Sequence, residues 1–469
     1  MNFNWKKQKR KNIFSITLNK RFNYAFAFIF KFPNFQIFKF AMYINVPEVK
    51  VPRVVIIGCG FGGLELAKQL RKAEVQLVLL DKNNYHTFQP LLYQVSTAGL
   101  EADSIAYPIR KIFKGQKNFH FRMGEVQKIV SEENKLITSI GELKYNYLVI
   151  ATGSTTNYFG IKDFEQNAMP MKSVTEALDL RSLILQNFEK ALLTKDLPEQ
   201  EALMTFVVVG GGPTGVELAG ALCELKKHVL PNDYPELDFR KMRVILIENG
   251  GELLQAMNET NRKRASTYLE ELGCEVWLNT GVTKYDGTTV ETKTGKQLLT
   301  SGLIWAAGIK AVLIDGLNKD SINARGRIII DDYCKVKSYE NIFAIGDVAC
   351  MVQEKYPNGH PQIAPVAIQQ AQLVASNLKK TFKQWTLNKF SYFDKGTMAT
   401  VGRNRAVVEV GSITFGRLFG WLAWMALHLM LLVGFRNRVV VFINWVWSYI
   451  NYDRNMRLII RPFKKKSSE

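Results

Sequence analysis

The chain has 469 residues, enough for two or three domains, and its content of 47% hydrophobic and 22% charged residues excludes extensive disorder. Its formal net charge of +20 is compatible with nucleic acid, an anionic membrane or an anionic small molecule, and charge alone does not choose among them. The five cysteines include no CxxC motif or close pair, so we expect no metal site, dithiol redox centre or disulfide framework.

Residues 1–50 form an extension ahead of the first predicted strand. The first 41 residues contain nine Lys or Arg, ten Phe and no acid, and without them the net charge would be +11. The opening resembles a signal peptide, but Lys31 and Pro33 interrupt the apolar stretch and no small-residue cleavage site follows. We expect a disordered tail or a start-site artefact with Met42 as the true start, and no export. The cations elsewhere are dispersed or lie beside an apolar C-terminal segment, so no nucleic-acid partner is expected.

The first glycine-rich motif, RVVIIGCGFGG, is an apolar strand followed by a turn and by the helical stretch LELAKQLRK. Its glycines permit a tight turn, close approach of a pyrophosphate and packing of helix on strand, and the helix N-terminus offers N–H donors to phosphate. The next strand, VQLVLLD, ends in an acid that can accept hydrogen bonds from a ribose. The predicted nucleotide contacts are Gly58, Gly60, Phe61, Gly62, Gly63, Asp81 and Lys82.

The same pattern returns in TFVVVGGGPTGVELAGAL, followed by a strand, RVILIE, that ends in Glu248. The stretch HVLPNDYPELDFRK between them is predicted to be an insertion because of its two prolines. Glu248 would bind both ribose hydroxyls and repel a 2′-phosphate, so this second site should prefer NADH to NADPH. The predicted contacts are Gly210, Gly212, Pro213, Thr214, Gly215 and Glu248.

Three further strands end in small-residue turns: YLVIATGS, GLIWAAGI and NIFAIGDVA. The first two are typical of points where the chain crosses between nucleotide domains, and the third places a carboxylate where it could bind a ribityl hydroxyl. The specific signal is their order along the chain: glycine motif, ATG, glycine motif, AAG and GD. The predicted contacts, with Val126 between the first motif and ATG, are Ala151, Thr152, Gly153, Ala307, Gly308, Gly346 and Asp347.

This order resembles the two-dinucleotide-binding-domain flavoproteins, in which FAD occupies a first, split domain and NAD(P)H an inserted second one. The resemblance implies an α/β fold with two Rossmann-like domains. The implied boundaries are 51–165 and 319–395 for the two parts of the FAD domain, 166–318 for the NADH domain, and 396–469 for a C-terminal amphipathic, membrane-anchoring helical region.

Longer stretches, including NNYHTFQPLLYQVSTAGL, APVAIQQA and DKGTMATVGRNRAV, resemble type II NADH dehydrogenases. That resemblance implies hydride transfer from NADH to FAD and then reduction of a membrane quinone, ubiquinone or menaquinone, without proton pumping. The implied catalytic residues are Glu217, Gln369, Gln370 and Lys395. Pro365 and Ala371 depart from the family pattern AQxAxQQG.

Two alternative functions compete with this one. A sulfide:quinone reductase needs cysteines near the flavin, but none lies between Cys59 and Cys223. A flavoprotein sensor that binds NADH and changes partners would differ from an enzyme in lacking rapid NADH turnover with quinone. The oligomeric state, including a homodimer, is left open by the sequence.

The C-terminal segment LFGWLAWMALHLMLLVGF, residues 418–435, has no charged residue but is borderline in length for crossing a bilayer. Trp421, Trp424, His428 and Leu431 form one helical stripe, which suggests an interfacial helix; a buried core helix is the alternative. Later aromatics and cations, among them Arg457 and Arg461, favour lipid headgroups. We expect monotopic attachment to the lipid surface on the cytoplasmic face of a bacterial inner membrane.

Overall fold

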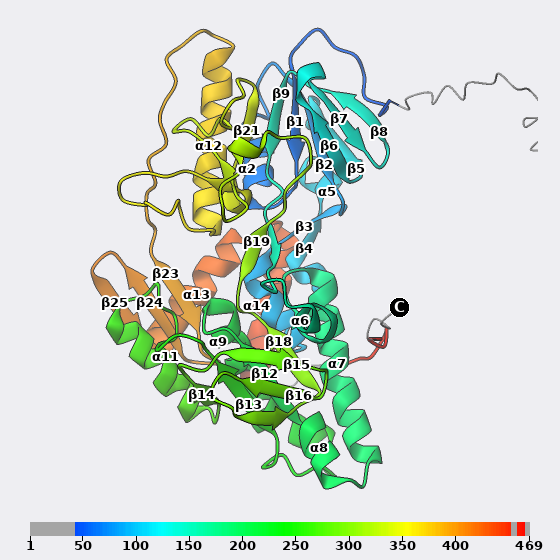
Figure 1. The fold of residues 1–469 in the computed structure, drawn as a ribbon, viewed down its shortest axis with the longest axis vertical. Helices are drawn as coiled ribbons and strands as arrows, with labels where there is room; N and C mark the ends of the chain where they lie inside the picture. Colours follow the sequence, from blue (N-terminus) through cyan, green and yellow to red (C-terminus); the bar gives the residue numbers. More distant parts are fainter. Residues whose placement is uncertain (1–42, 452–456, 465–469) are drawn as a thin grey trace, which may run out of the picture. The chain divides into compact units, whose positions relative to one another are not determined.

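The computed structural model describes residues 43–451 and 457–464, and two parallel five-stranded sheets organise them (Figure 1). The first sheet has the order β21-β9-β1-β2-β5. Its strands are β21 (Ile342–Ala344), β9 (Tyr147–Ile150), β1 (Arg53–Ile57), β2 (Gln76–Asp81) and β5 (Phe119–Met123). The strand β21 comes from far along the chain, so the strands of the second sheet lie between β9 and β21 in the sequence.

The second sheet repeats this arrangement with the order β11-β18-β12-β13-β14. Its strands are β11 (Met169–Pro170), β18 (Gly302–Trp305), β12 (Thr205–Val209), β13 (Arg243–Ile247) and β14 (Glu275–Trp277). Its central strands are almost entirely buried, as expected for parallel strands covered on both faces. The predicted α/β class is confirmed.

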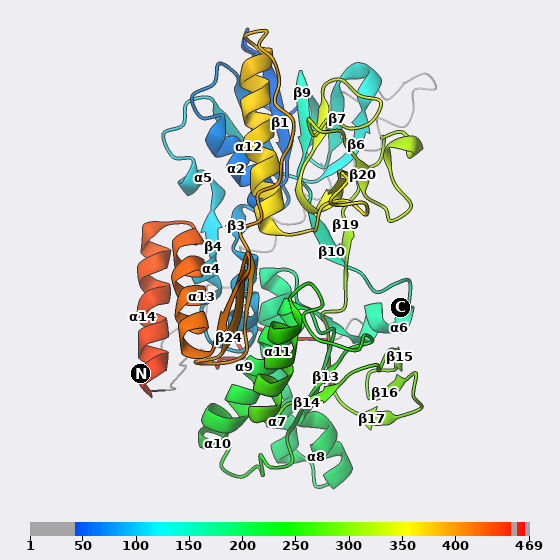
Figure 2. The same cartoon turned by 90° about the vertical axis from the view of Figure 1, so that its left-hand side faces the viewer.

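Helices and small antiparallel sheets cover both large sheets. On the first sheet, helix α2 (Phe61–Gln69) packs against α12 (Ala364–Thr381), and a meander of β6 (Val126–Val130), β7 (Lys135–Thr138) and β8 (Gly141–Lys144) lies on the opposite face (Figure 2). The part of the chain that carries the second sheet, called the second part below, contains four helices. They are α7 (Val174–Leu193), α8 (Leu197–Leu203), α9 (Pro213–Glu224) and α11 (Glu259–Glu271). It also holds a meander of β15 (Val282–Tyr285), β16 (Thr289–Thr292) and β17 (Gln297–Leu299).

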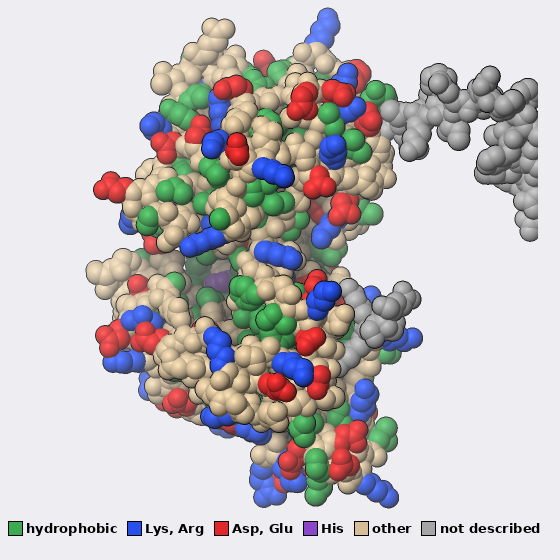
Figure 3. All heavy atoms as spheres, viewed as in Figure 1, with side chains coloured by type: hydrophobic (Ala, Val, Ile, Leu, Met, Phe, Trp, Pro, Cys, Tyr) green, Lys and Arg blue, Asp and Glu red, His purple; other side chains and the backbone are tan. Residues whose placement is uncertain are grey.

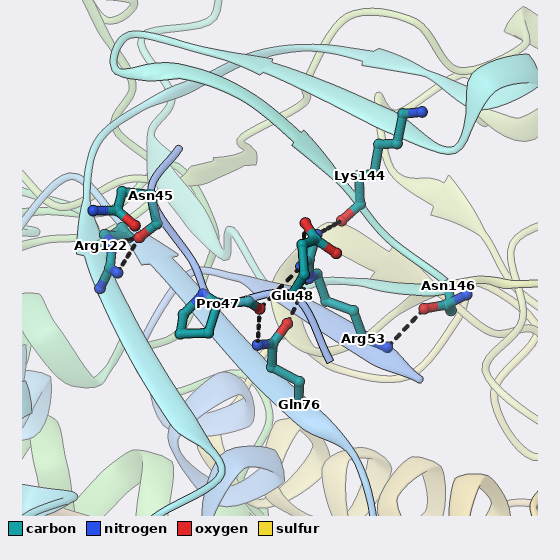
Figure 4. Close-up of polar contacts among 8 residues, drawn as sticks. All are labelled: Asn45, Pro47, Glu48, Arg53, Gln76, Arg122, Lys144 and Asn146. Carbon is teal, nitrogen blue, oxygen red and sulfur yellow. Dashed lines mark hydrogen bonds and ion pairs between the residues drawn. The ribbon is translucent and has the colours of Figure 1, made fainter. Parts of the chain in front are cut away.

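The segment just before β1 is fastened to the first sheet (Figure 4). The side chains of Ile44 and Val46 are buried in the first core, so this part of the chain packs earlier than the domain boundary expected at residue 50. Gln76 Nε2 donates to the Pro47 carbonyl over 2.6 Å, and Arg53 Nε donates to Gln76 Oε1 over 2.6 Å. The interpretation of residues 1–41 lies outside the described residues.

A pair of short strands links the two parts of the chain that contain the large parallel sheets. β10 (Ser154–Thr156) follows the ATG turn, β19 (Ile309–Ala311) follows the AAG turn, and the two pair antiparallel. Thr152 Oγ1 also donates to the Val312 carbonyl over 2.6 Å. The two small-residue turns therefore mark the places where the chain passes from one sheet to the other and back.

The last part of the chain forms a small sheet and a helical hairpin. The sheet is β23 (Thr397–Thr400), β24 (Ala406–Val410) and β25 (Ile413–Gly416), and it packs on α9 and α11 within the second core. Helices α13 (Arg417–Leu431) and α14 (Phe435–Asn451) follow and pack against each other. Among the helices of the described residues, none has the length and hydropathy needed to cross a membrane.

The interfacial stripe expected on α13 is divided between the protein interior and the exposed face of the helix. Trp424 and His428 are buried, with ring centroids stacked 4.0 Å apart, and they pack near Tyr93 and Phe88. The exposed face of α13 is instead apolar, because it carries Leu418, Phe419, Leu422, Leu427, Met430 and Leu431. The prediction that this stripe faces the interface is therefore wrong for Trp424 and His428, whereas Leu431 of the same stripe is exposed.

Candidate functional site

The first glycine turn has no room for side chains at two of its three motif positions. Gly58 has φ +98°, and a Cβ there would lie 2.4 Å from the Ala151 carbonyl oxygen. A Cβ on Gly63 would lie 1.9 Å from the Gly58 carbonyl oxygen. A Cβ on Gly60, in contrast, would meet no atom of the described residues within 4 Å. The turn therefore presents bare backbone to open space at the N-terminus of α2, which suits a pyrophosphate.

The second glycine turn repeats this geometry at the N-terminus of α9. Gly210 has φ +114°, and its Cβ would lie 2.6 Å from the Ala306 carbonyl oxygen. A Cβ on Gly215 would lie 1.9 Å from the Gly210 carbonyl oxygen, while one on Gly212 would meet nothing within 4 Å among the described residues. The Ala307 Cα also lies beside the Gly210 position, so the AAG turn borders this second cradle.

An acid at the end of β2 and another just after β13 accept hydrogen bonds that hold the two glycine turns. Asp81 accepts N–H bonds from Cys59 over 2.6 Å and from Asn83 over 2.7 Å. Glu248 accepts from Gly211 and Gly250, both over 2.6 Å. Burial raises the pKa of Asp81, and the two backbone N–H bonds act against that rise. These carboxylates lie where a ribose would follow the pyrophosphate, and each already fixes the shape of its turn.

His86 is a residue of this site that the sequence analysis missed. Its buried Nδ1 lies 2.7 Å from the Cys59 carbonyl, and its ring meets Phe61 edge to face at 5.5 Å. Burial lowers the pKa of His86 to about 4, so the ring is neutral at pH 7. The stretch NNYHTFQPLLYQ was noticed as a family resemblance, but only the fold shows that its histidine supports the first glycine turn.

The remaining residues predicted around the two cradles differ in exposure. Lys82, Pro213 and Thr214 are exposed at the rims of the turns, whereas Gly62 packs beneath Ile345. Val126 is buried at the start of β6, close after the strand that pairs with β2. The Gly153 backbone has φ +70° at the crossing turn, and the Gly308 carbonyl accepts the Asn157 N–H over 3.1 Å.

The GD turn after β21 joins the first cradle to α12. The Gly346 N–H donates to Gln370 Oε1 over 2.7 Å, and Gln370 is buried. Asp347 accepts a hydrogen bond from Ser154, and Lys172 Nζ lies 3.8 Å from the same carboxylate oxygen. Lys172 was not predicted, because no motif distinguishes it. The predicted acid is thus placed at the switch between the two parts of the chain.

Gln369 holds the segment that precedes Lys395. Gln369 exchanges two hydrogen bonds of 2.9 Å with the Phe393 backbone, one donated by its Nε2 and one accepted by its Oε1. Lys395, two residues further on, is exposed and forms no ion pair among the described residues. Of the two departures from the family pattern, Pro365 lies in the first turn of α12, where proline is well tolerated, and Ala371 is fully buried.

Glu217 lies on α9, buried in the middle of the protein. Its Oε1 is 3.5 Å from the Thr400 N–H, and the Thr400 hydroxyl lies 3.2 Å from the Tyr93 hydroxyl. Burial raises the pKa of Glu217 to about 8, although the Thr400 N–H and the nearby Trp424 indole lower it in part. The group can therefore hold or release a proton near neutral pH.

Figure 3 shows the molecular surface hollowed between the part that carries α12 and the part that carries the second sheet. The two glycine cradles lie at the carboxyl ends of their parallel sheets, the usual location of ligands in such folds. Two dinucleotides can therefore be held by one chain.

Comparisons with known proteins agree with this geometry. Residues 52–371 match the family described as pyridine nucleotide-disulphide oxidoreductase. The chain is 38% identical over 424 residues to the type II NADH:quinone oxidoreductase NdhA of Mycobacterium tuberculosis, which covers 87% of this chain and 89% of that protein. It is 31% identical to the type II NADH:quinone oxidoreductase of Haemophilus influenzae, which covers 78% of this chain and 88% of that protein.

Two solved structures share the fold. NDH2 from Plasmodium falciparum, in complex with NADH, has a TM-score of 0.80 at 20% identity and covers 87% of this chain and 100% of its own. The sulfide:quinone oxidoreductase from Aquifex aeolicus has a TM-score of 0.67 at 19% identity and covers 85% of this chain and 95% of its own. At these identities the likeness concerns the fold alone.

Proposed function

The chain belongs to the pyridine nucleotide-disulphide oxidoreductase family and, within it, to the type II NADH:quinone oxidoreductases, and on this premise we propose the following reaction. NADH, one proton and a membrane quinone, ubiquinone or menaquinone, are converted to NAD⁺ and the quinol, without proton pumping. The observation that carries the proposal is the pair of glycine cradles with the same geometry, joined by β10 and β19.

FAD fits the first cradle and NADH the second. The open position at Gly60 would receive the FAD pyrophosphate, and the Gly346–Asp347 turn, held by Gln370 of α12, would border the same site. Bound FAD supplies the two-electron chemistry, accepting hydride from nicotinamide and passing electrons to quinone. At the second cradle, the negative charge of Glu248 at the ribose position favours NADH over NADPH.

Two sets of side chains are proposed to act around the reacting groups. Glu217 lies on the helix that begins at the second cradle and exchanges protons near neutral pH. Gln370 fixes the Gly346 turn, and Gln369 fixes the segment that carries Lys395. Lys395 then offers a positive charge toward a reduced quinone oxygen.

The exposed apolar face of α13 and α14 is proposed to lie in one leaflet of the membrane. Besides the apolar side chains of α13, this face carries Phe435, Phe442, Ile443, Val446, Trp447 and Ile450. Their combined apolar area, next to tryptophan and tyrosine, is typical of an interfacial helix pair. We place the protein on the cytoplasmic face of a bacterial inner membrane, where NADH in water meets quinone in lipid.

Steady-state assay of the purified protein tests this function. We expect a flavin absorption spectrum and NADH oxidation that depends on added quinone, with little oxidation of NADPH. Sulfide in place of NADH should give no quinone reduction, because the one cysteine of the first cradle, Cys59, is buried and its thiol pKa is raised by burial. A flavoprotein that binds NADH without turning over quinone would contradict the proposal and favour a sensor.

A further inference from the structure

A basic pocket lies where the α13–α14 hairpin meets the second dinucleotide-binding part. It has a volume of about 380 Å³, and three segments supply most of its lining residues. The first is the π-helical turn η3 (Leu225–Val229), the second is the turn between β23 and β24, and the third is the start of α13. The lining residues are Glu224, Lys227, His228, Leu272, Arg403, Asn404, Arg405, Arg417 and Leu418.

The charges of this pocket are unbalanced. The four cations are Lys227, Arg403, Arg405 and Arg417. Two carboxylates are nearby, and both are engaged: Glu224 accepts the Arg403 backbone N–H, and Glu271 accepts Arg405 Nε over 3.2 Å. Within the described residues, Lys227 and Arg417 form no ion pair. The pocket therefore has a positive excess suited to an anion with several oxygens, such as a phosphate.

The pocket is continuous with the apolar face of the hairpin. Leu418 lines the pocket, and the next residue, Phe419, is 77% exposed on that face. The Arg403 guanidinium lies 3.7 Å from the centroid of the Tyr449 ring near the end of α14. The start of α13 thus forms one side of the pocket, and Arg403 of its lining contacts Tyr449 near the end of α14.

Two of the other cations predicted to meet lipid form ion pairs within the protein. Arg457 pairs with Asp233, and Arg461 pairs with Asp179, so both fasten the end of the chain to the second part. Arg436 and Arg438 are exposed at the opposite end of the hairpin. Along the described hairpin, only the pocket joins several basic side chains to a concave surface beside exposed apolar residues.

We propose that this pocket binds the phosphate of an anionic membrane lipid whose acyl chains lie against the exposed face of α13 and α14. The proposal rests on the proposed membrane attachment and adds a specific headgroup site to it. Charge complementarity selects the phosphate, and continuity with the apolar face selects a lipid over a soluble phosphate.

Vesicle binding by the full-length, flavin-loaded protein tests this site. We expect tighter binding to vesicles containing phosphatidylglycerol than to vesicles of phosphatidylcholine alone. The double variant Lys227→Gln with Arg417→Gln should lose about tenfold in affinity for the anionic vesicles, and little for the neutral ones, since each juxtamembrane cation contributes on the order of 1 kcal/mol. NADH oxidation with a water-soluble quinone should stay unchanged.

A matched control removes the same charge elsewhere. Lys190 and Lys195 are exposed in and after the end of α7, and Lys190→Gln with Lys195→Gln should leave the preference for anionic vesicles intact. If both double variants lost the same affinity for anionic vesicles, net charge and not the pocket would explain the binding. If inorganic phosphate displaced the protein from the vesicles, the pocket would bind a soluble phosphate and not a lipid. If the wild-type protein bound neither kind of vesicle, the membrane attachment itself would fail, whereas binding to neutral vesicles without an effect of the pocket variant would refute only the headgroup site.

Discussion

At the scale of single residues, the third glycine of each motif, Gly63 in the first and Gly215 in the second, can be replaced by alanine. The two variants form a matched pair. In both turns the added Cβ would lie 1.9 Å from a backbone carbonyl oxygen, so the turn must distort, at a cost of about 1–3 kcal/mol or more. We expect Gly63→Ala to lose bound flavin, and Gly215→Ala to keep flavin while its affinity for NADH falls about tenfold. The flavin-to-protein absorbance ratio and NADH titration measure these effects. Flavin loss in Gly215→Ala alone would mean that the two sites are assigned in reverse.

The buried carboxyl of Glu217 should make stability depend on pH. Its pKa of about 8 in the folded protein lies above its ordinary value of 4.5, so the folded state keeps a proton that the unfolded chain releases. Its stabilising contribution is therefore complete below about pH 4.5 and decreases as pH rises to about 8, by on the order of a few kcal/mol. We expect Glu217→Gln to weaken this decrease, as measured by thermal unfolding across that range. The control is Glu354→Gln, which removes an exposed carboxylate and should leave the dependence of stability on pH as in the wild type. If Glu217→Gln also had the wild-type dependence, Glu217 would be ionised throughout this pH range.

At the scale of elements, the sequence predicted the parts that depend on local chemistry. Glycine spacing identifies both turns, because only glycine tolerates the positive φ and the close carbonyl contacts of Gly58 and Gly210. The ATG and AAG turns were correctly expected where the chain crosses between the sheets. These features are encoded within about ten residues of chain.

Features that depend on tertiary packing were not predictable in the same way. Helical periodicity groups Trp424 with His428 but does not say which face of α13 meets the protein, and here these two side chains are buried. Arg457 and Arg461 look free in the sequence, yet carboxylates distant in the chain pair with them. The sheet β23–β25 was expected to belong to the membrane anchor, but it packs on α9 and α11.

The apolar face of the hairpin gives a prediction at the same scale. Phe419 on α13 is 77% exposed, and burial of such a side chain in a leaflet stabilises attachment by roughly 1.5–3 kcal/mol. We therefore expect Phe419→Asp to weaken binding to phosphatidylcholine vesicles by about tenfold or more, as measured by flotation. Leu193, 83% exposed at the end of α7, is the control, and Leu193→Asp should bind as the wild type does. Equal retention of both variants on the vesicles would argue against this face as the anchor.

At the scale of the whole molecule, the two half-reactions should separate the residues on the proposed quinone side. Lys395→Ala should leave reduction of the flavin by NADH unchanged and slow its reoxidation by quinone by about tenfold to a hundredfold, as for loss of one charged hydrogen bond. Gln370→Ala should slow both steps, because Gln370 holds the Gly346 N–H at the first cradle. Stopped-flow absorbance records both rates. If reoxidation by quinone were unchanged in Lys395→Ala, Lys395 would be a solvated loop charge without a role in quinone reduction.

The described residues combine two glycine cradles with an exposed apolar hairpin, as expected if electrons pass from a water-soluble donor to a lipid-soluble acceptor. The most direct measurement mixes the flavin-loaded wild-type protein rapidly with NADH in the absence of oxygen and then with a quinone. We predict complete bleaching of the flavin by NADH, followed by its full return with quinone, each at least as fast as steady-state turnover. A flavin that NADH does not bleach, or that quinone fails to reoxidise at that rate, would contradict NADH:quinone oxidoreduction by this protein.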